Sequence, residues 1–179
     1  MQIFAAMNKC VFLDRDGVLN ADDPNYTFLV EKFKILPGVP EALAALKKSG
    51  YKLVVVTNQS GIAKGIYTIP QMRACHDYLQ QVCHHAIDAF YFSPYHVSVT
   101  SSLLTKPDTL MFERAIARFE VDISASWMVG DRGRDIIPAR NLRIKTIQIG
   151  DEIEEKDKAD FKVESLLEAA HLILKSSRD

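Results

Sequence analysis

Two carboxylates, Asp14 and Asp16, follow directly after the apolar run Cys10–Leu13 and stand just before Gly17. An apolar run without alternation is typical of a strand that is buried on both faces of a parallel sheet. The acids would then lie at the carboxyl end of that strand, where open α/β sheets bind their ligands. Carboxylates this close repel each other unless a cation neutralises them, which indicates a hard divalent metal. Because Asp-x-Asp-Gly is also common in solvated turns, this segment alone leaves both interpretations open.

Polar residues also follow a second apolar run. Thr57 offers a hydroxyl there, and residues 58–61, Asn-Gln-Ser-Gly, offer backbone amides in a turn that glycine permits. Such a turn can bind the oxygens of a phosphate group, although these residues are also ordinary turn formers. Farther along, Lys106 precedes Pro107 and a helical pattern. It is either a surface lysine or a cation placed to neutralise a bound phosphate.

Two further carboxylates, Asp131 and Asp135, come after the apolar run Trp127–Gly130. Asp131 ends its run as Asp14 ends the first one, which favours a role for both in one site. Asp135 is equally well explained as a helix cap. Each signal is ordinary, but their joint occurrence after successive apolar runs predicts a single functional site.

Short apolar runs alternate with helical patterns along the whole chain. The predicted strands are Cys10–Leu13, Leu53–Thr57, Ala89–Phe92, Trp127–Gly130 and Lys145–Ile149. The predicted helices cover residues 39–48, 72–83, the segment from an N-cap at Asp108 to Phe119, 135–141 and 164–175. This alternation predicts an α/β fold with a doubly wound parallel sheet and helices on both faces. The connections 20–36 and 93–105 are too short for a lid domain, so we expect no cap domain and an open cleft.

The composition narrows the class of protein. At 179 residues we expect one domain, 1–179, with residues 1–6 loosely ordered. The net charge of −1, with acids and bases interspersed, argues against nucleic acid or a membrane as a partner. The three cysteines suit reduced core residues of a cytoplasmic protein rather than a disulfide framework. We therefore expect a cytoplasmic monomer that acts on a small substrate.

Three segments carry a resemblance to a known family. They are Phe-Leu-Asp-Arg-Asp-Gly at residues 12–17, Val-Thr-Asn-Gln-Ser-Gly-Ile-Ala-Lys-Gly at 56–65 and Met-Val-Gly-Asp at 128–131. With them the chain resembles the haloacid dehalogenase superfamily of phosphohydrolases along nearly its whole length. More narrowly, it looks like the D-glycero-D-manno-heptose 1,7-bisphosphate phosphatases and their relatives, the histidinol-phosphate phosphatases.

The resemblance implies a catalytic mechanism. Asp14 would attack phosphorus and become an aspartyl-phosphate, while Asp16 would protonate the leaving alcohol and then activate water. Mg²⁺ would be held by Asp14, the backbone carbonyl of Asp16 and Asp131.

The resemblance also implies which residues contact the substrate. Thr57 and Asn58 would hold the transferred phosphoryl group together with Lys106, and Asp135 would orient Lys106 or a metal-bound water. The remaining phosphate- and substrate-binding residues would be Gln59, Ser60, Asp22, Tyr26 and Arg132.

One loop departs from the heptose phosphatases, which bind structural zinc there through Cys-x-His and Cys-x-Cys before Arg-Lys-Pro. The corresponding segments here are Ser-Pro-Tyr-His at residues 93–96 and Ser-Leu-Leu-Thr-Lys-Pro at 102–107. His96 alone does not make a four-ligand zinc site, so we expect no structural zinc. Thr105 stands where the family has arginine, so the resemblance carries over the class of reaction but not the identity of the substrate.

These observations together predict a Mg²⁺-dependent phosphomonoesterase that acts on a small phosphorylated metabolite, foremost a sugar bisphosphate such as D-glycero-D-manno-heptose 1,7-bisphosphate. Histidinol phosphate, another metabolite or a nucleotide remains an alternative substrate. A phospho-aspartate signalling domain of the receiver type is the alternative from another class. Asp16 disfavours it, because an acid/base group beside the phosphorylated aspartate serves rapid hydrolysis.

Overall fold

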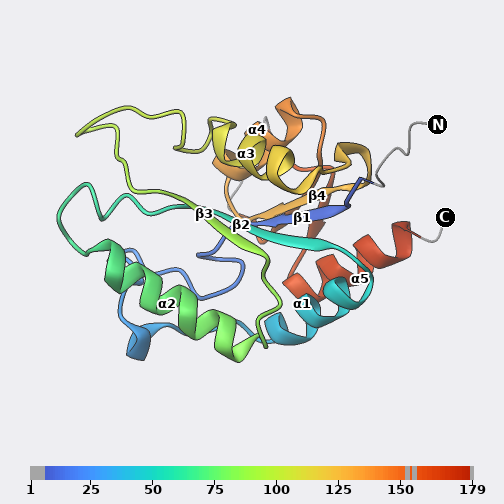
Figure 1. Cartoon of the computed structure of the whole chain (residues 1–179), viewed down its shortest axis with the longest axis horizontal. Coiled ribbons are helices and arrows are strands. Elements are labelled where there is room, and N and C mark those ends of the chain that lie inside the picture. Colours follow the sequence, from blue (N-terminus) through green and yellow to red (C-terminus); the bar gives the residue numbers. More distant parts are fainter. Residues whose placement is uncertain (1–6, 152–153, 155–156, 178–179) are drawn as a thin grey trace.

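The computed structural model describes residues 7–151, 154 and 157–177, and the expectation for residues 1–6 lies outside this range. In the described part of the chain, six strands form one sheet in which all neighbours are parallel. The order is β3-β2-β1-β4-β5-β6, with bounds β1 Cys10–Leu13, β2 Lys52–Asn58, β3 Ala89–Ser93, β4 Trp127–Gly130, β5 Lys145–Ile149 and β6 Phe161–Val163. The strand order reverses at β1 and β4 (Figure 1), which opens a crevice at their carboxyl ends.

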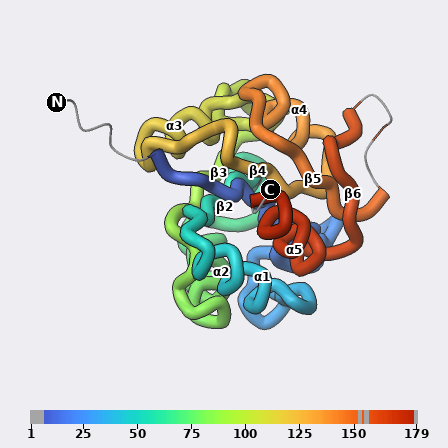
Figure 2. Tube along the Cα trace, turned by 90° about the vertical axis from the view of Figure 1, so that its right-hand side faces the viewer, coloured from blue at the N-terminus to red at the C-terminus, as the bar shows by residue number. Residues whose placement is uncertain are grey.

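Helices cover both faces of the sheet. α1 (Val39–Lys48), α2 (Ile69–Val82) and α5 (Leu166–Ser176) pack on one face, and α3 (Leu110–Phe119) and α4 (Gly133–Asn141) pack on the other. The cartoon and the Cα tube both show α3 and α4 on one side of the strands and α1, α2 and α5 on the opposite side (Figures 1 and 2). The predicted doubly wound α/β fold is confirmed.

β1 is buried on both sides along its whole length. Val11 and Leu13 pack in the cluster formed with α1, α2 and α5, whereas Cys10 and Phe12 pack in the cluster formed with α3 and α4. Successive strand side chains point to opposite faces, so a strand covered on both faces needs an unbroken apolar run. Burial of each large apolar side chain stabilises the fold by about 1.5–3 kcal/mol. The strand end that carries Asp14 is therefore anchored firmly.

Four helices begin at residues other than those predicted. α2 begins at Ile69 rather than at residue 72, and α5 begins at Leu166 rather than at residue 164. The N-cap of α3 is Thr109, so the prediction of Asp108 as the cap is wrong. The backbone amide of Asp108 instead donates to the carbonyl of Thr105 at 3.0 Å and closes a turn ahead of the helix. α4 begins at Gly133 rather than at Asp135, which lies in its first turn.

Three short elements were not predicted from the sequence. β6 contains only three residues at the sheet edge, and two of them are exposed. The other two are single 3₁₀ turns, Val30–Lys32 and Ile123–Ala125, without buried residues. Elements this short bury too little apolar surface to create a periodic pattern in the sequence.

The connections 20–36 and 93–105 both contribute residues to one cleft of about 620 Å³. The second connection is the long loop between β3 and α3 in Figure 1. The described residues contain no separate lid domain over this cleft. All three cysteines are buried and free, and no helix in the described ranges is long and apolar enough to cross a bilayer.

Candidate active site

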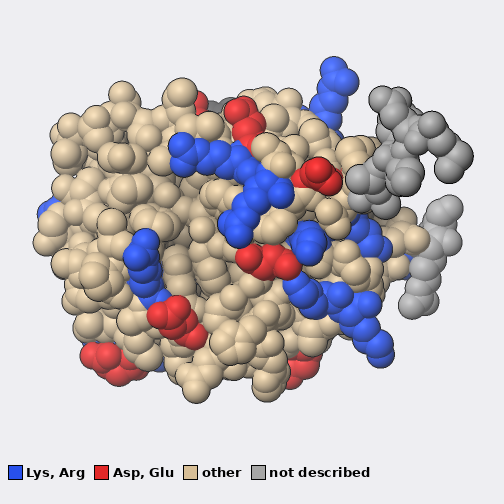
Figure 3. Space-filling view, viewed as in Figure 1, with Lys and Arg blue, Asp and Glu red and all other residues tan. Residues whose placement is uncertain are grey.

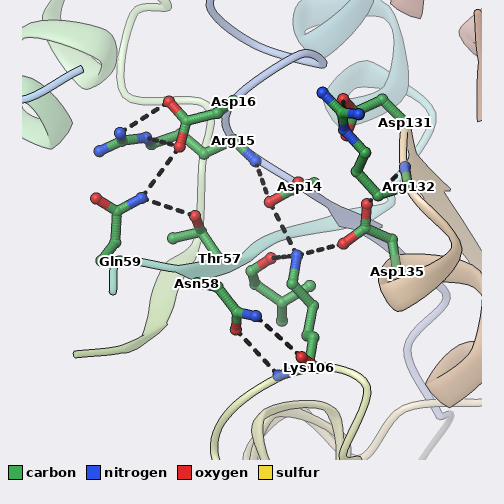
Figure 4. Close-up of polar contacts among 11 residues, drawn as sticks. Asp14, Arg15, Asp16, Thr57, Asn58, Gln59, Lys106, Asp131, Arg132 and Asp135 are labelled. Carbon is green, nitrogen blue, oxygen red and sulfur yellow. Dashed lines mark hydrogen bonds and ion pairs between the residues drawn. The ribbon is translucent and has the colours of Figure 1, made fainter. Parts of the chain in front are cut away.

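Lys106 lies at the centre of a buried ion-pair network. Its Nζ atom is 2.9 Å from Asp14 Oδ1 and 2.6 Å from Asp135 Oδ1, and it donates to the carbonyl of Val56 at 2.7 Å (Figure 4). Asn58 secures the backbone of Lys106: its side-chain amide donates to the Lys106 carbonyl and accepts from the Lys106 amide, both at 3.0 Å. The side chain of Asn58 therefore fixes the lysine.

Burial and like charges alter the proton affinities in this network. Burial, together with the Asp135 carboxylate, raises the pKa of Asp14 to about 6, although Lys106 acts in the opposite direction. Burial alone would lower the pKa of Lys106, but Asp135 and Asp14 outweigh it and raise that pKa. Lys106 is therefore a permanent cation between two carboxylates.

Three carboxylates form an acidic cluster, which consists of Asp14, Asp131 and Asp135. One ligand oxygen from each lies within 4.8 Å of the others. Burial, followed by the charges of Asp14 and Asp135, raises the pKa of Asp131 to about 7. Its Oδ1 atom is buried and has no hydrogen-bond partner among the described residues. An all-oxygen cluster with such an orphaned atom fits a hard divalent cation such as Mg²⁺.

Two glycines make room for this acidic cluster. A Cβ atom on Gly17 would lie 2.3 Å from Asp131 Oδ2, and one on Gly130 would lie 2.4 Å from the Cβ of Asp135. Gly17 also has a φ of +84°, which side chains with a Cβ rarely adopt. The positions of the Asp131 and Asp135 side chains thus depend on the lack of a side chain at Gly17 and Gly130.

The carboxylate of Asp16 lies apart from the acidic cluster and is held by four donated hydrogen bonds. Arg15 donates from Nε at 3.1 Å and from a terminal nitrogen at 2.8 Å, Asn20 donates at 2.9 Å, and the Gln59 amide donates at 3.1 Å. The Arg15 side chain is buried and also donates to the carbonyl of Thr27 at 2.8 Å. Metal contact through the backbone carbonyl of Asp16 stays a prediction.

Gln59 connects Asp16 to the second strand end. Besides Asp16, its Nε2 atom donates to Thr57 Oγ1 at 2.9 Å, while its Oε1 atom accepts from the Tyr67 hydroxyl at 2.8 Å. The predicted phosphate-binding residues Thr57 and Gln59 are thus buried beside one another. Sequence reasoning missed Arg15, Asn20 and Tyr67, because no motif spacing indicates that these side chains fold back onto the site.

The other predicted substrate residues lie farther out. Asp22, Tyr26 and Ser60 line the cleft, and the Lys64 ammonium donates to the Tyr26 hydroxyl at 2.8 Å, which lowers the pKa of that hydroxyl. Arg132 pairs with Asp22 at 3.2 Å but is not a lining residue of the cleft. Through Nε, Arg132 also pairs with Asp131 Oδ2 at 3.2 Å, so it connects the rim to the acidic cluster.

Asp135 combines the two roles considered for it. Its Oδ2 atom accepts from the backbone amide of Arg132 at 3.1 Å, as a carboxylate in the first turn of a helix does. Its Oδ1 atom pairs with Lys106. The side chain thus caps α4 and holds the lysine at the same time.

His96 lies in the loop for which we expect no structural zinc. The Nδ1 atom of His96 lies 2.7 Å from the hydroxyl of Ser98 and accepts from the Ser98 amide at 3.1 Å. Within the described ranges, the acidic cluster is the only group of three side chains suited to a metal ion. The expected lack of structural zinc stays a prediction.

Known proteins of similar sequence are named as sugar bisphosphate phosphatases. The protein of Pasteurella multocida named D-glycero-beta-D-manno-heptose-1,7-bisphosphate 7-phosphatase is 33% identical over 93% of this chain and 97% of its own length. The Escherichia coli protein of the same name is 32% identical over 94% of this chain and 95% of its own length.

A solved structure of similar fold also belongs to a sugar bisphosphate phosphatase. The D,D-heptose 1.7-bisphosphate phosphatase from B. bronchiseptica, solved with magnesium and phosphate, has a TM-score of 0.85 and 26% identity, and the match covers 94% of this chain and 99% of that one. A family model for haloacid dehalogenase-like hydrolases matches residues 12–143, which contain the whole acidic cluster. The resemblance drawn from the sequence motifs is thus confirmed, and the chain belongs to the haloacid dehalogenase-like hydrolase family.

Proposed function

We propose that this protein is a Mg²⁺-dependent phosphomonoesterase that works through an aspartyl-phosphate on Asp14 and hydrolyses a sugar bisphosphate. The observation that carries the proposal is the buried Lys106, which pairs with Asp14 at 2.9 Å beside the acidic cluster. A cation held against a buried nucleophile offsets negative charge on both the nucleophile and an incoming phosphate.

In the first half-reaction, a carboxylate oxygen of Asp14 attacks phosphorus, and the bond from phosphorus to the leaving oxygen breaks. Lys106 and the backbone amide of Arg15 both donate to Oδ1 of Asp14, at 2.9 and 2.7 Å. Oδ2 receives no hydrogen bond from the described residues and is available to attack. Asp16 gives its proton to the leaving oxygen, so the product departs as an alcohol.

In the second half-reaction, water attacks the aspartyl-phosphate and the bond between phosphorus and Asp14 breaks. Asp16, now a carboxylate, takes the proton of this water, which restores both residues. Thr57 and Lys106 would support the phosphoryl oxygens. Asp135 keeps the Lys106 ammonium in place throughout.

Asp14, Asp131 and the backbone carbonyl of Asp16 would hold Mg²⁺, and Asp135 lies close enough to bind a water on the ion. The bound ion would withdraw negative charge from the phosphoryl group. Support comes from the orphaned, buried oxygen of Asp131 and from the magnesium and phosphate in the related structure.

The substrate we favour is D-glycero-D-manno-heptose 1,7-bisphosphate, since several relatives of similar length are named for it. The cleft of about 620 Å³ is large enough for a sugar with two phosphates. Thr105 lines it at the position of the family arginine. Histidinol phosphate and nucleotides are therefore the comparison substrates.

Phosphate release from a panel of these compounds, with Mg²⁺ or with EDTA, tests the proposal. We expect turnover with Mg²⁺, loss in EDTA and recovery on addition of Mg²⁺, with the heptose bisphosphate hydrolysed most efficiently. Asp14→Asn, which keeps the side-chain shape, is the control for contaminating phosphatases. Full activity in EDTA, or equal activity of Asp14→Asn, would contradict the mechanism.

We further propose a cytoplasmic monomer that acts on small molecules. Basic and acidic side chains are interspersed on the face seen in Figure 3 rather than gathered into a field of one sign, which suits a small substrate better than a polyanion. The buried, free cysteines suit a reducing compartment. Light scattering at the concentration used for the assays tests the oligomeric state.

A further inference from the structure

The hydroxyl of Tyr67 donates a hydrogen bond that the proposed mechanism has not used. It donates to Oε1 of Gln59 at 2.8 Å, and the amide nitrogen of Gln59 donates in turn to Asp16 at 3.1 Å and to Thr57 at 2.9 Å. One amide thus links a tyrosine to the acid/base residue and to a phosphate-binding hydroxyl. Figure 4 shows the Gln59 amide between Thr57 and Asp16.

The ring of Tyr67 is fixed in place by its surroundings. It stacks on Phe28 with ring centroids 5.0 Å apart and planes 9° apart, and it lies 5.8 Å from the ring of Tyr26. A Cβ atom on Gly61 would lie 2.2 Å from this ring, so the backbone passes directly against it. Only 4% of Tyr67 is exposed. Its hydroxyl is therefore a rigid donor rather than a mobile one.

A rigid donor decides which way the Gln59 amide faces. A glutamine amide has an acceptor oxygen and a donor nitrogen of nearly equal shape. Burial raises the pKa of Tyr67 well above its ordinary value, so the hydroxyl keeps its proton and donates. With Oε1 bound to that proton, Nε2 must face Asp16 and Thr57. If the amide turned over, its oxygen would face Asp16 and Thr57, and both hydrogen bonds that Nε2 donates to them would be lost.

We propose that Tyr67 is a positioning residue for phosphoryl transfer, because it orients the Gln59 amide that holds Asp16 and Thr57 in place. The inference rests on the proposed phosphatase function and deepens it. Tyr67 itself touches no reacting atom. Its loss should disturb the proton donor Asp16 and leave the nucleophile Asp14, with its own contacts to Lys106, unaffected.

Tyr67→Phe removes one oxygen atom and keeps the stacked ring. The matched control is Tyr51→Phe, which also deletes a buried tyrosine hydroxyl, one that lies 2.6 Å from Ser177 Oγ and outside the cleft. The measured quantity is kcat/KM, which reports the step up to leaving-group departure, for an alkyl phosphate and for 4-nitrophenyl phosphate. Aryl leaving groups need little protonation, so they depend less on Asp16.

We expect Tyr67→Phe to lower kcat/KM about tenfold for the alkyl phosphate and less than about threefold for the aryl phosphate, since general acids contribute about 10²–10⁴-fold. Tyr51→Phe should leave the ratio of the two values unchanged. A general loss of folded protein would lower kcat/KM equally for both substrates. An unchanged ratio in folded Tyr67→Phe overturns the inference.

Gln59→Met tests the same connection from its other end and leaves the aromatic stack intact. We expect the same drop in the alkyl-to-aryl ratio, and Tyr67→Phe should cause no further drop in this background. An independent, additive effect of Tyr67→Phe overturns the proposal. If the unaltered protein hydrolyses no phosphate ester with Mg²⁺, the proposed function itself fails, which is a distinct result.

Discussion

The buried end of the cleft and its outer rim are held by different kinds of contact. At the buried end, the Lys106 and Asp135 side chains are fully buried and their charges are paired within 2.6 Å. At the rim, Val97 is 81% exposed and Leu103 68% exposed, and the Asp22–Arg132 ion pair joins two partly exposed side chains. The contrast indicates that rigid, buried groups determine the class of reaction. Substrate choice depends instead on exposed residues, whose substitution should change the free energy of unfolding little.

The largest expected effect lies at the buried end. Asp16→Asn keeps the shape and the backbone carbonyl but cannot transfer a proton, so we expect about a 10²–10⁴-fold loss with alkyl phosphates. With an aryl phosphate, the substitution should slow attack by Asp14 less than it slows hydrolysis of the intermediate. Intact mass after a rapid acid quench should then reveal a phosphate on Asp14. Hydrolysis of alkyl phosphates at the original rate would rule out Asp16 as the acid/base.

The second effect concerns stability. Lys106→Met leaves two buried carboxylates without their cation, and removal of one partner of a buried ion pair costs about 3–5 kcal/mol. Lys64→Met, at an exposed lysine whose ammonium contacts the Tyr26 hydroxyl and ring, is the matched rim variant and should cost less than about 1 kcal/mol. Urea denaturation measures both. Equal losses would remove the proposed contrast between the two regions.

The third effect links pH to the metal. The raised pKa values of Asp131, about 7, and Asp14, about 6, mean that the metal-free folded state binds more protons than the unfolded chain. These groups therefore contribute stability below about pH 4 that is lost as the pH rises through 6 and 7.

Mg²⁺ binds the charged carboxylates and should reverse this loss. We expect Mg²⁺ to raise the Tm little at about pH 5 and by about 4 °C or more at about pH 8. Asp131→Asn should abolish most of the gain at the higher pH. A gain of the same size at every pH would contradict binding at the acidic cluster.

The smallest effect is expected at the rim. Val97→Ser changes an exposed side chain, so stability should stay within about 0.5 kcal/mol. Because Val97 lines the cleft, any kinetic change should appear in KM for the larger substrates and leave kcat nearly the same. A large fall in kcat would show that the rim takes part in the chemical step.

The sequence predicted the buried end well for a physical reason. Parallel strands place their carboxyl ends on one edge, so Asp14, Thr57 and Asp131 could be brought together from strand positions alone. The family resemblance implied that Asp135 orients Lys106 or a metal-bound water, and the structure shows a 2.6 Å contact between Lys106 and Asp135.

Contacts that depend on loop paths were not predictable in this way. The side-chain amide of Gln59 contacts Asp16, Thr57 and Tyr67, which the sequence did not indicate. Phosphate binding by Gln59 stays a prediction. The Tyr67 contact depends on the course of the loop after β2, which no periodic pattern describes. Asp108 was a wrong cap because α3 begins two residues later, at Leu110.

The two glycines against the acidic cluster have a consequence for the evolution and engineering of this enzyme. Because Asp131 and Asp135 each occupy the volume that a methyl group on Gly17 or Gly130 would fill, even alanine at either position would push a carboxylate out of the site. Engineering of this site for new substrates should therefore begin at exposed rim residues such as Val97 and keep both glycines.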